Sequence, residues 1–375
     1  MTDKVYITQL KLENFRNYET LKQDFDGRHV ILTGDNGSGK TNLMEAASLM
    51  TPGRGIRRSA YIDLPKANTD GSFSVFAKLE GMCGQASIGT GLTPDEPGSR
   101  RIRINGANAR TNDELLDHSR MLWLTPSMDG LFTGGAGDRR RFLDRLVLAI
   151  DPQHGRRSLS YERAMRSRNK LLSEGRIDPV WLDGLEEQMA ELGIAIASAR
   201  QEFVKMLIGL IDANGEDTVF PKAIPGLEGF DLGAGDDAAV DKEQNYIEHL
   251  KQTRGRDAAA GRSLTGPHKS DLIVFHNKKN MPAAHCSTGE QKALLIGLIL
   301  AHARLVLNLT GFAPILLLDE VAAHLDADRR MALFDLVESL NCQCFMTGTD
   351  KSMFDAMDTR AQYFNVSDGK LTETS

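Results

Sequence analysis

The chain has 375 residues, of which 41% are hydrophobic and 26% are charged, and its formal net charge at pH 7 is −6. This is the composition of an ordinary soluble globular protein that is long enough for two or three domains. No run reaches the roughly 20 consecutive apolar residues of a membrane span, and the four cysteines form no CxxC pair, so we expect a reduced, cytoplasmic protein with no membrane partner.

A phosphate-binding loop is the first element that carries chemistry. Residues 29–33 are strand-like and residues 41–50 have helical composition, and GDNGSGKT between them matches the GxxxxGK[ST] pattern. Glycines let successive N–H groups point at phosphates, and the following helix adds its positive end. Lys40 can reach the β- and γ-phosphates, and the Thr41 hydroxyl can ligate Mg²⁺. The predicted nucleotide-binding residues are Gly34, Asp35, Asn36, Gly37, Ser38, Gly39, Lys40, Thr41 and Asn42.

The long stretch 42–286 predicts an insertion, because a single crossover connection would be far shorter. Residues 72–125 are strand-rich, with an Asn105-Gly106 turn signal, and are expected to complete an N-terminal β lobe. Residues 136–260 look helical, and 233–244 are expected to form an exposed connection. Within this stretch, apolar residues recur at alternating steps of three and four positions, and we call this row the seam. It covers only about three heptads, which favours a bundle helix over an extended coiled coil. Its residues are Met189, Leu192, Ile196, Ala199, Phe203, Met206 and Leu210.

Basic residues are clustered although the chain is acidic overall. The stretch 153–176 alone holds seven Arg or Lys and two Glu. Such clusters favour a localised track for DNA phosphates, but a helix face braced by acidic neighbours is the open alternative. No aromatic residues are interleaved for base stacking, so backbone contact without sequence reading is expected. The candidate DNA-contacting residues are Arg54, Arg57, Arg58, Arg139, Arg140, Arg141, Arg156 and Arg157.

The polar segment CSTGEQK (286–292) stands directly before the apolar stretch 293–309. A serine hydroxyl and backbone N–H groups at a helix start can form an anion site. Further on, PILLLDEVAAHLD (314–326) begins with a run typical of a strand buried in a parallel sheet and continues with two carboxylates. We expect Asp319 to hold Mg²⁺ through water and Glu320 to act as the catalytic base, with Lys40 as its catalytic partner on the phosphates.

This order of motifs resembles the ABC-type ATPases. Within that class, the segments LKLENFRNYE, GDNGSGKTNLMEAASLM, RRRFLDRLV, TGPHKSDL, STGEQKALLIGLILA and ILLLDEVAAHLD resemble the RecF family of bacterial recombination and repair proteins. The resemblance implies that Ser287, Gly289 and Gln291 hold the ATP of a second subunit, with Asp326 as a further nucleotide contact. It also implies an ATP-gated homodimer that binds DNA at single-strand gaps and assists RecA loading with RecO and RecR.

The resemblance implies an α/β fold: an ABC-type ATPase head, with a P-loop sheet, flanking helices and a β-rich N-terminal lobe, that carries an inserted helical lobe. The expected parts are residues 1–135 (head, with the P-loop), 136–260 (helical lobe or short arm) and 261–375 (head, with the signature and carboxylate strand).

Two departures from ABC heads are visible. No glutamine occurs in 123–131, where such heads carry a metal-sensing one, and 346–349 reads MTGT where a switch histidine is usual. Slow hydrolysis is therefore expected, typical of a molecular switch rather than a motor. We also expect DNA to stimulate this weak activity. A transporter ATPase should carry LSGGQ and both missing groups, and another SMC-like DNA ATPase head should carry long heptad arms. A P-loop kinase would leave STGEQ without a role.

Overall fold

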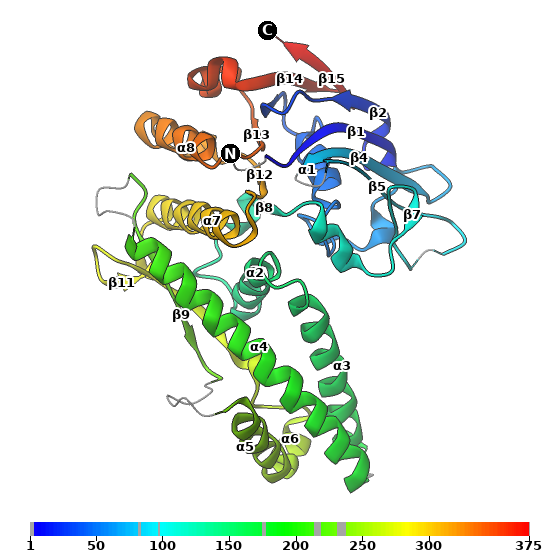
Figure 1. The fold of residues 1–375 in the computed structure, drawn as a ribbon, viewed down its shortest axis with the longest axis vertical. Helices are drawn as coiled ribbons and strands as arrows, with labels where there is room; N and C mark the ends of the chain where they lie inside the picture. The colour runs from blue at the N-terminus through cyan, green and yellow to red at the C-terminus, as the bar shows by residue number, and fades with distance from the viewer. Residues whose placement is uncertain are drawn as a thin grey trace. The chain divides into compact units, whose positions relative to one another are not determined.

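The computed structural model describes residues 4–81, 84–96, 98–174, 178–213, 219–230 and 238–374 and divides into two compact units (Figure 1). Unit 1 comprises 1–129, 216–221 and 288–375, and unit 2 comprises 130–215 and 222–287. The divisions at 129/130 and 287/288 differ from the expected boundaries at 135/136 and 260/261. The second one moves because strands on either side of 260 pair with each other within unit 2.

A six-stranded, mostly parallel sheet lies in unit 1 in the order β15-β14-β3-β13-β12-β8. Its strands are β3 (His29–Thr33), β8 (Met121–Leu124), β12 (Ile315–Leu318), β13 (Cys344–Gly348), β14 (Ala361–Ser367) and β15 (Lys370–Thr374). Every residue of β3, β8, β12 and β13 is buried, as continuous apolar runs predict. The strands predicted before the phosphate loop and before the carboxylates are therefore confirmed. Strand β8 was expected in the β lobe but pairs with β12 instead.

The β lobe of unit 1 is an antiparallel sheet in the order β2-β1-β4-β5-β6-β7. Its strands are β1 (Tyr6–Phe15), β2 (Tyr18–Asp24), β4 (Phe73–Gly81), β5 (Gly84–Leu92), β6 (Arg101–Ile104) and β7 (Ala107–Asn108). The predicted turn joins β6 to β7, with positive φ at both Asn105 (51°) and Gly106 (83°), as a two-residue hairpin requires. One apolar core is shared by this lobe and the parallel sheet.

The helices of unit 1 flank these sheets. They are α1 (Lys40–Ser48), α7 (Thr288–Thr310) and α8 (Ala327–Ser339), with short 3₁₀ turns η1 (Tyr61–Asp63), η2 (Asn112–Asp117), η3 (Pro126–Met128), η6 (Ala322–His324) and η7 (Lys351–Arg360). Contrary to the sequence expectation, α7 is long and apolar enough to cross a membrane. Most of its apolar residues are buried, as in the core helix of a folded domain.

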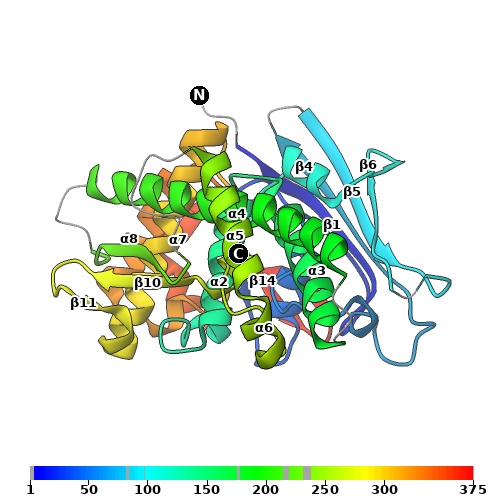
Figure 2. The same cartoon turned by 90° about the horizontal axis from the view of Figure 1, so that it is seen from below.

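Unit 2 is built on α4 (Pro179–Ala213), which runs beside α3 (His154–Ser173) in Figure 2. Its other elements are α2 (Ala136–Leu148), α5 (Ala239–Gln252), α6 (Arg254–Ala260), β9 (Ala223–Glu228), β10 (Asp271–His276), β11 (Met281–Pro282) and the 3₁₀ turns η4 (Pro267–Lys269) and η5 (Ala283–His285). The unit is thus not wholly helical, because β11-β10-β9 form a small antiparallel sheet. The expected connection at 233–244 begins outside the described residues and continues into α5.

Helix α4 is a bundle helix, as predicted, because α2, α3, α5 and β9 all pack against it. The predicted seam is only partly right. Met189, Ile196 and Phe203 are buried, whereas the other four seam positions are only partly buried, and Leu192 among them packs against the apolar core of the unit. Packing from several sides instead buries the neighbouring residues Ala190, Gly193, Ile194, Ala197, Arg200, Val204, Leu207 and Ile211.

Candidate nucleotide site

The phosphate loop leaves β3 and enters α1 in a backbone conformation that requires glycine. Gly34 and Gly39 have φ of 138° and 116°, in the left-handed region that other residues rarely adopt. A Cβ atom on Gly34 would lie 2.3 Å from the Val366 carbonyl oxygen, and one on Gly39 would lie 2.5 Å from Nδ2 of Asn17. The backbone conformation and close packing at these two positions therefore favour glycine there, independently of any phosphate.

The turn between β1 and β2 holds this loop from outside. Nδ2 of Asn17 donates to the Ser38 carbonyl at 3.1 Å, and the Tyr18 hydroxyl donates to the Gly39 carbonyl at 3.0 Å. Nδ2 of Asn42 in turn donates to Oδ1 of Asn17 at 2.7 Å. Burial raises the pKa of the Tyr18 phenol, so it stays a neutral donor at physiological pH. Sequence reasoning missed this support, although ENFRNYE was already conspicuous.

Lys40 is 5% exposed and lies folded onto the loop, where its Nζ donates to the Gly34 and Asp35 carbonyls at 2.6 and 2.9 Å. Burial lowers the pKa of this ammonium, and nearby carboxylates, Glu320 foremost, offset this only in part. The Oγ of Ser38 is buried with no hydrogen-bond partner within the described residues. A cation held by two carbonyls and an orphaned hydroxyl are the groups that nucleotide phosphates would engage.

Asp319 follows β12 and lies beside α1. The Thr41 hydroxyl lies 3.1 and 3.0 Å from its two carboxylate oxygens, and Asp319 itself is 5% exposed. The two predicted metal-binding residues are thus brought together. In the described part of the chain no three His, Cys, Asp or Glu side chains gather as a metal site. A divalent cation here would therefore depend on phosphate oxygens of a nucleotide, as Mg²⁺ in nucleotide sites commonly does.

Glu320 occupies a strained backbone position next to Asp319. Its φ is +54°, which is uncommon for a residue with a side chain. Its backbone N–H donates to Oγ1 of Thr347 at 2.8 Å, and the same hydroxyl donates to Oδ1 of Asp319 at 2.7 Å. Thr347 belongs to β13, the strand next to β12. Sequence reasoning noted the stretch 346–349 as the end of an apolar strand and for its missing histidine, and overlooked this hydroxyl.

The signature residues Ser287, Gly289 and Gln291, at the start of α7, differ in how exposed they are. Ser287 and Gly289 are exposed at the start of α7, whereas Gln291 is buried, at 6% exposure, within unit 1. Gln291 is therefore placed differently from the two residues with which it was grouped, because the helix turns its side of the first turn into the core. The following Lys292 is also buried and pairs with Asp129 at 3.3 Å. That ion pair lines a narrow hollow that extends to Asp319.

Asp326 has a local structural role. It is the N-cap residue of α8, and its Oδ1 accepts a hydrogen bond from the Arg329 backbone N–H at 2.8 Å. Its contact with a nucleotide stays a prediction.

The arginines after α1 are not alike. The side chains of Arg16 and Arg57 both pair with the fully buried Glu45, at 2.8 and 2.9 Å, and Arg57 also donates to Asn42. Arg57 is therefore engaged in bracing α1, the helix that follows the phosphate loop. Exposure does not separate the three, because Arg54 and Arg58 are exposed as Arg57 is, and Arg58 also has a contact of its own.

The arginine triplet of α2 is also engaged within unit 2. Arg139 forms a two-pronged ion pair with Asp271 on β10, at 2.8 and 2.6 Å, and this contact raises its pKa. Arg140 donates to the Ser270 carbonyl at 2.9 Å, and Arg141 pairs with Asp138. In the following helix, Arg157 pairs with Asp151 at 2.5 Å, and Arg156 is exposed and also has a contact of its own. These contacts favour the bracing alternative for Arg139, Arg140 and Arg157.

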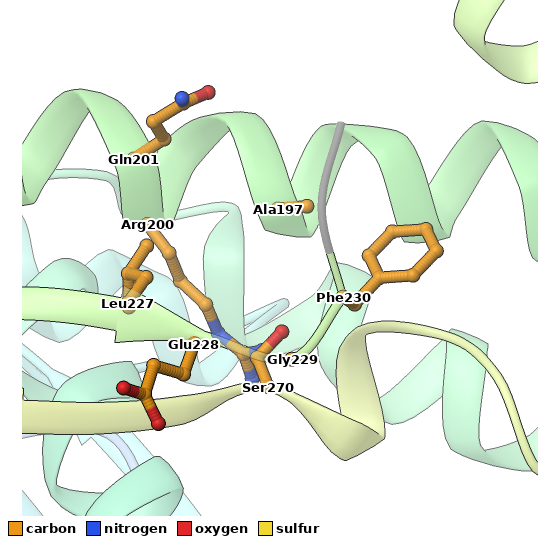
Figure 3. A pocket seen from close by; sticks show the side chains of 8 residues that line it. All are labelled: Ala197, Arg200, Gln201, Leu227, Glu228, Gly229, Phe230 and Ser270. Atoms are coloured by element: carbon orange, nitrogen blue, oxygen red, sulfur yellow. The ribbon is translucent and has the colours of Figure 1, made fainter. Parts of the chain in front are cut away.

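A separate cavity of about 360 Å³ lies in unit 2 between α4, β9 and Ser270 (Figure 3). Arg200 reaches into it from α4, but its guanidinium already pairs with Asp144, at 2.8 Å, and donates to the Pro267 carbonyl. The principal cation of this cavity is thus neutralised within the unit, and nothing about its lining resembles the phosphate loop.

Comparison with known proteins identifies relatives that match this chain over nearly its whole length. The family described as RecF/RecN/SMC N terminal domain matches residues 6–372. A DNA replication and repair protein RecF of Rhizobium leguminosarum bv. trifolii is 61% identical over 374 residues, covering 100% of both chains. The protein of the same name from Rhizobium meliloti is 58% identical over 373 residues, covering 99% of this chain and 100% of the relative.

Solved structures show the same fold. A structure of the recombination mediator protein RecF with ATP, in the RecFOR pathway, is similar with a TM-score of 0.87 at 24% identity, covering 99% of this chain and 98% of the other. An Smc head bound to the C-terminal winged-helix domain of ScpA is similar with a TM-score of 0.57 at 17% identity, covering 99% and 98%. The expected fold class, an ABC-type ATPase head of the RecF and SMC kind, is thereby confirmed.

Proposed function

The chain belongs to the RecF family, and on that premise we propose that it is an ATP-gated DNA-binding protein of replication and recombinational repair. The observation that carries this proposal is the assembly of Lys40, Thr41, Asp319 and Glu320 around one phosphate loop. These four residues come from the two ends of the chain and have the residue types that phosphoryl chemistry uses.

ATP is the ligand that this site is proposed to bind. The loop N–H groups and Lys40 hold the β- and γ-phosphates, and the orphaned Ser38 hydroxyl gains a partner. Thr41 and Asp319 would hold Mg²⁺ together with the phosphates, and the ion would supply charge neutralisation at the transferred phosphoryl group. Glu320 accepts the proton of the attacking water. Hydrolysis is slow, because a metal-sensing glutamine and a switch histidine are both missing.

The exposed signature residues Ser287 and Gly289 support a dimer. Ser287 and Gly289 are proposed to meet the γ-phosphate held by a second copy of the chain, so that ATP closes the dimer. A transporter-type or long-armed relative is disfavoured because unit 2 is a compact bundle. The proposed setting is the cytoplasm, where the dimer acts on gapped DNA with RecO and RecR to assist RecA loading.

The DNA surface is proposed to lie on the outer face of α3. Arg156, Arg163, Arg166 and Lys170 recur there at helical spacing and are all exposed. Two of these residues form long ion pairs: Arg166 lies 3.8 Å from Glu162, and Lys170 lies 3.9 Å from Glu174. Exposed pairs of this kind contribute little to stability, so these cations can turn to DNA phosphates at small cost.

Size analysis with and without ATP and gapped DNA tests the function as a whole. We expect the protein to be a monomer without nucleotide and a dimer with ATP, and gapped DNA to accelerate hydrolysis. A protein that keeps one size in ATP, or hydrolyses ATP at the same rate with and without DNA, would contradict the proposal.

Lys40→Arg is expected to abolish or cripple ATP-driven dimerisation. Arginine keeps the positive charge, but its planar fork cannot replace a compact ammonium between phosphates. Dimer fraction at saturating ATP is the measurement, and Lys22→Arg on the exposed edge strand β2 is the matched control. Dimerisation of Lys40→Arg at the wild-type level would show that Lys40 does not hold the nucleotide.

Replacing Arg163, Arg166 and Lys170 by glutamine is expected to weaken binding equally for unrelated DNA sequences. The log–log salt slope should fall by roughly 0.9 for each DNA phosphate that is no longer neutralised, and ATP binding should survive. The melting temperature should stay unchanged, since these side chains form only exposed pairs.

The matched comparison replaces Arg139, Arg140 and Arg141 by glutamine. Because Arg139 and Arg140 are engaged within unit 2, that variant should melt at a lower temperature and keep its salt slope. If the salt slope instead flattened for the α2 variant and not for the α3 variant, the DNA surface would lie on α2.

A further inference from the structure

We propose that Thr347 is the positioning residue that sets the backbone of Glu320 for hydrolysis, an inference that rests on the ATP hydrolysis proposed above. A threonine hydroxyl has one proton to donate and lone pairs to accept with. Here the proton goes to Oδ1 of Asp319 at 2.7 Å, and a lone pair receives the Glu320 backbone N–H at 2.8 Å. One hydroxyl thus connects both members of the carboxylate pair.

The position of Thr347 in the sheet makes this contact rigid. It lies inside β13 and is fully buried, and β13 pairs in parallel register with β12, which ends immediately before Asp319. A β-branched side chain in a strand has restricted rotation about χ1, so the hydroxyl is held in one direction. The Asp319 carboxylate and the Glu320 backbone are therefore both hydrogen-bonded to a hydroxyl that the neighbouring strand holds in place.

The two carboxylates do not depend on Thr347 equally. Asp319 is also contacted by the Thr41 hydroxyl at both of its oxygens, so its orientation has a second support. Glu320 has φ of +54°, a conformation with an intrinsic cost, and its N–H is anchored by the threonine. Loss of the hydroxyl should consequently disturb Glu320 more than Asp319, and hydrolysis more than binding.

The test compares Thr347→Val, Thr347→Ser and Thr347→Ala in the full chain. Valine keeps the shape and removes the hydroxyl, and kcat for ATP should fall roughly 10- to 100-fold, because small misplacements of a catalytic group cost factors of that size. KM and the binding of a slowly hydrolysed ATP analogue should change little. Serine restores the hydroxyl and should recover most of kcat, whereas alanine should behave like valine.

A matched control separates positioning from mere stability. Thr90 is another buried strand threonine of unit 1, whose hydroxyl donates to the Arg101 carbonyl at 3.0 Å in the β lobe. Thr90→Val should lower the melting temperature as Thr347→Val does, but it should leave kcat unchanged. Equal kcat losses in the two variants would reduce Thr347 to a packing residue and overturn the inference.

The double variant Thr347→Val/Glu320→Gln separates the inference from the function on which it rests. If Thr347 acts through Glu320, the valine should have little further effect once Glu320 is gone. Full-rate hydrolysis by Thr347→Val beside an inactive Glu320→Gln would overturn the inference alone. Full-rate hydrolysis by Glu320→Gln itself would instead overturn the role of Glu320 in the proposed function.

Discussion

Glu320→Gln should hydrolyse ATP at least about 100-fold more slowly than the wild type while it still binds ATP and dimerises. The carboxamide has nearly the same shape, but it cannot accept a proton from the attacking water. Asp319 and Thr41 are untouched, so the phosphates and their counter-ion keep their ligands. If hydrolysis opens the proposed dimer, the variant should accumulate as a long-lived ATP-bound dimer. Single-turnover hydrolysis and size analysis measure the two properties on the same sample.

The control is an ordinary glutamate of the same unit. Glu338 on α8 is half-exposed and contacts His29 at 3.0 Å, at the start of β3 and away from the phosphate loop that follows its end. Glu338→Gln should hydrolyse ATP normally and dimerise reversibly. Normal turnover by Glu320→Gln would mean that another group activates the water, and the strained backbone at Glu320 would need a different explanation.

The parts of the site that could be predicted from sequence are those with a local cause. The phosphate loop is specified by glycines whose left-handed backbone other residues rarely adopt, and at Gly34 and Gly39 an added Cβ atom would also meet close neighbours. The strand before Asp319 follows from four apolar residues in a row, and the Asn105-Gly106 hairpin follows from its turn chemistry. In each case a short segment carries the whole signal.

What could not be predicted depends on partners far apart in the chain. Thr347 contacts Asp319 across 28 positions, and Arg139 contacts Asp271 across 132. No local sequence pattern indicates that a threonine hydroxyl contacts a distant carboxylate, or that an arginine pairs with a distant acidic residue. The α4 seam was incomplete for a similar reason: periodicity located one buried face, but several packed neighbours bury more of the helix than a single partner would. Strand β8 was misplaced because its partner β12 is distant in sequence.

Ser287→Arg should bind ATP as a monomer and fail to dimerise. Ser287 is exposed, and a Cβ atom built on Gly289 would meet nothing within 4 Å, so the start of α7 offers open space to a second subunit. A bulky cation there would fill that space, while the phosphate loop of the same chain keeps all its contacts. Nucleotide affinity and dimer fraction, measured together, should therefore separate completely.

Asn308→Arg is the matched control, since it adds the same charge to an exposed position near the other end of α7 and should dimerise normally. Ser287→Ala removes only the hydroxyl and should weaken the dimer without abolishing it, because the backbone N–H groups of the helix start remain. Gln291→Ala adds a further distinction. Its side chain is buried, so it should act on stability before it acts on assembly. If monomeric Ser287→Arg loses ATP binding instead, the signature serves the nucleotide of its own chain, and a dimer closed by ATP across two subunits is the wrong description.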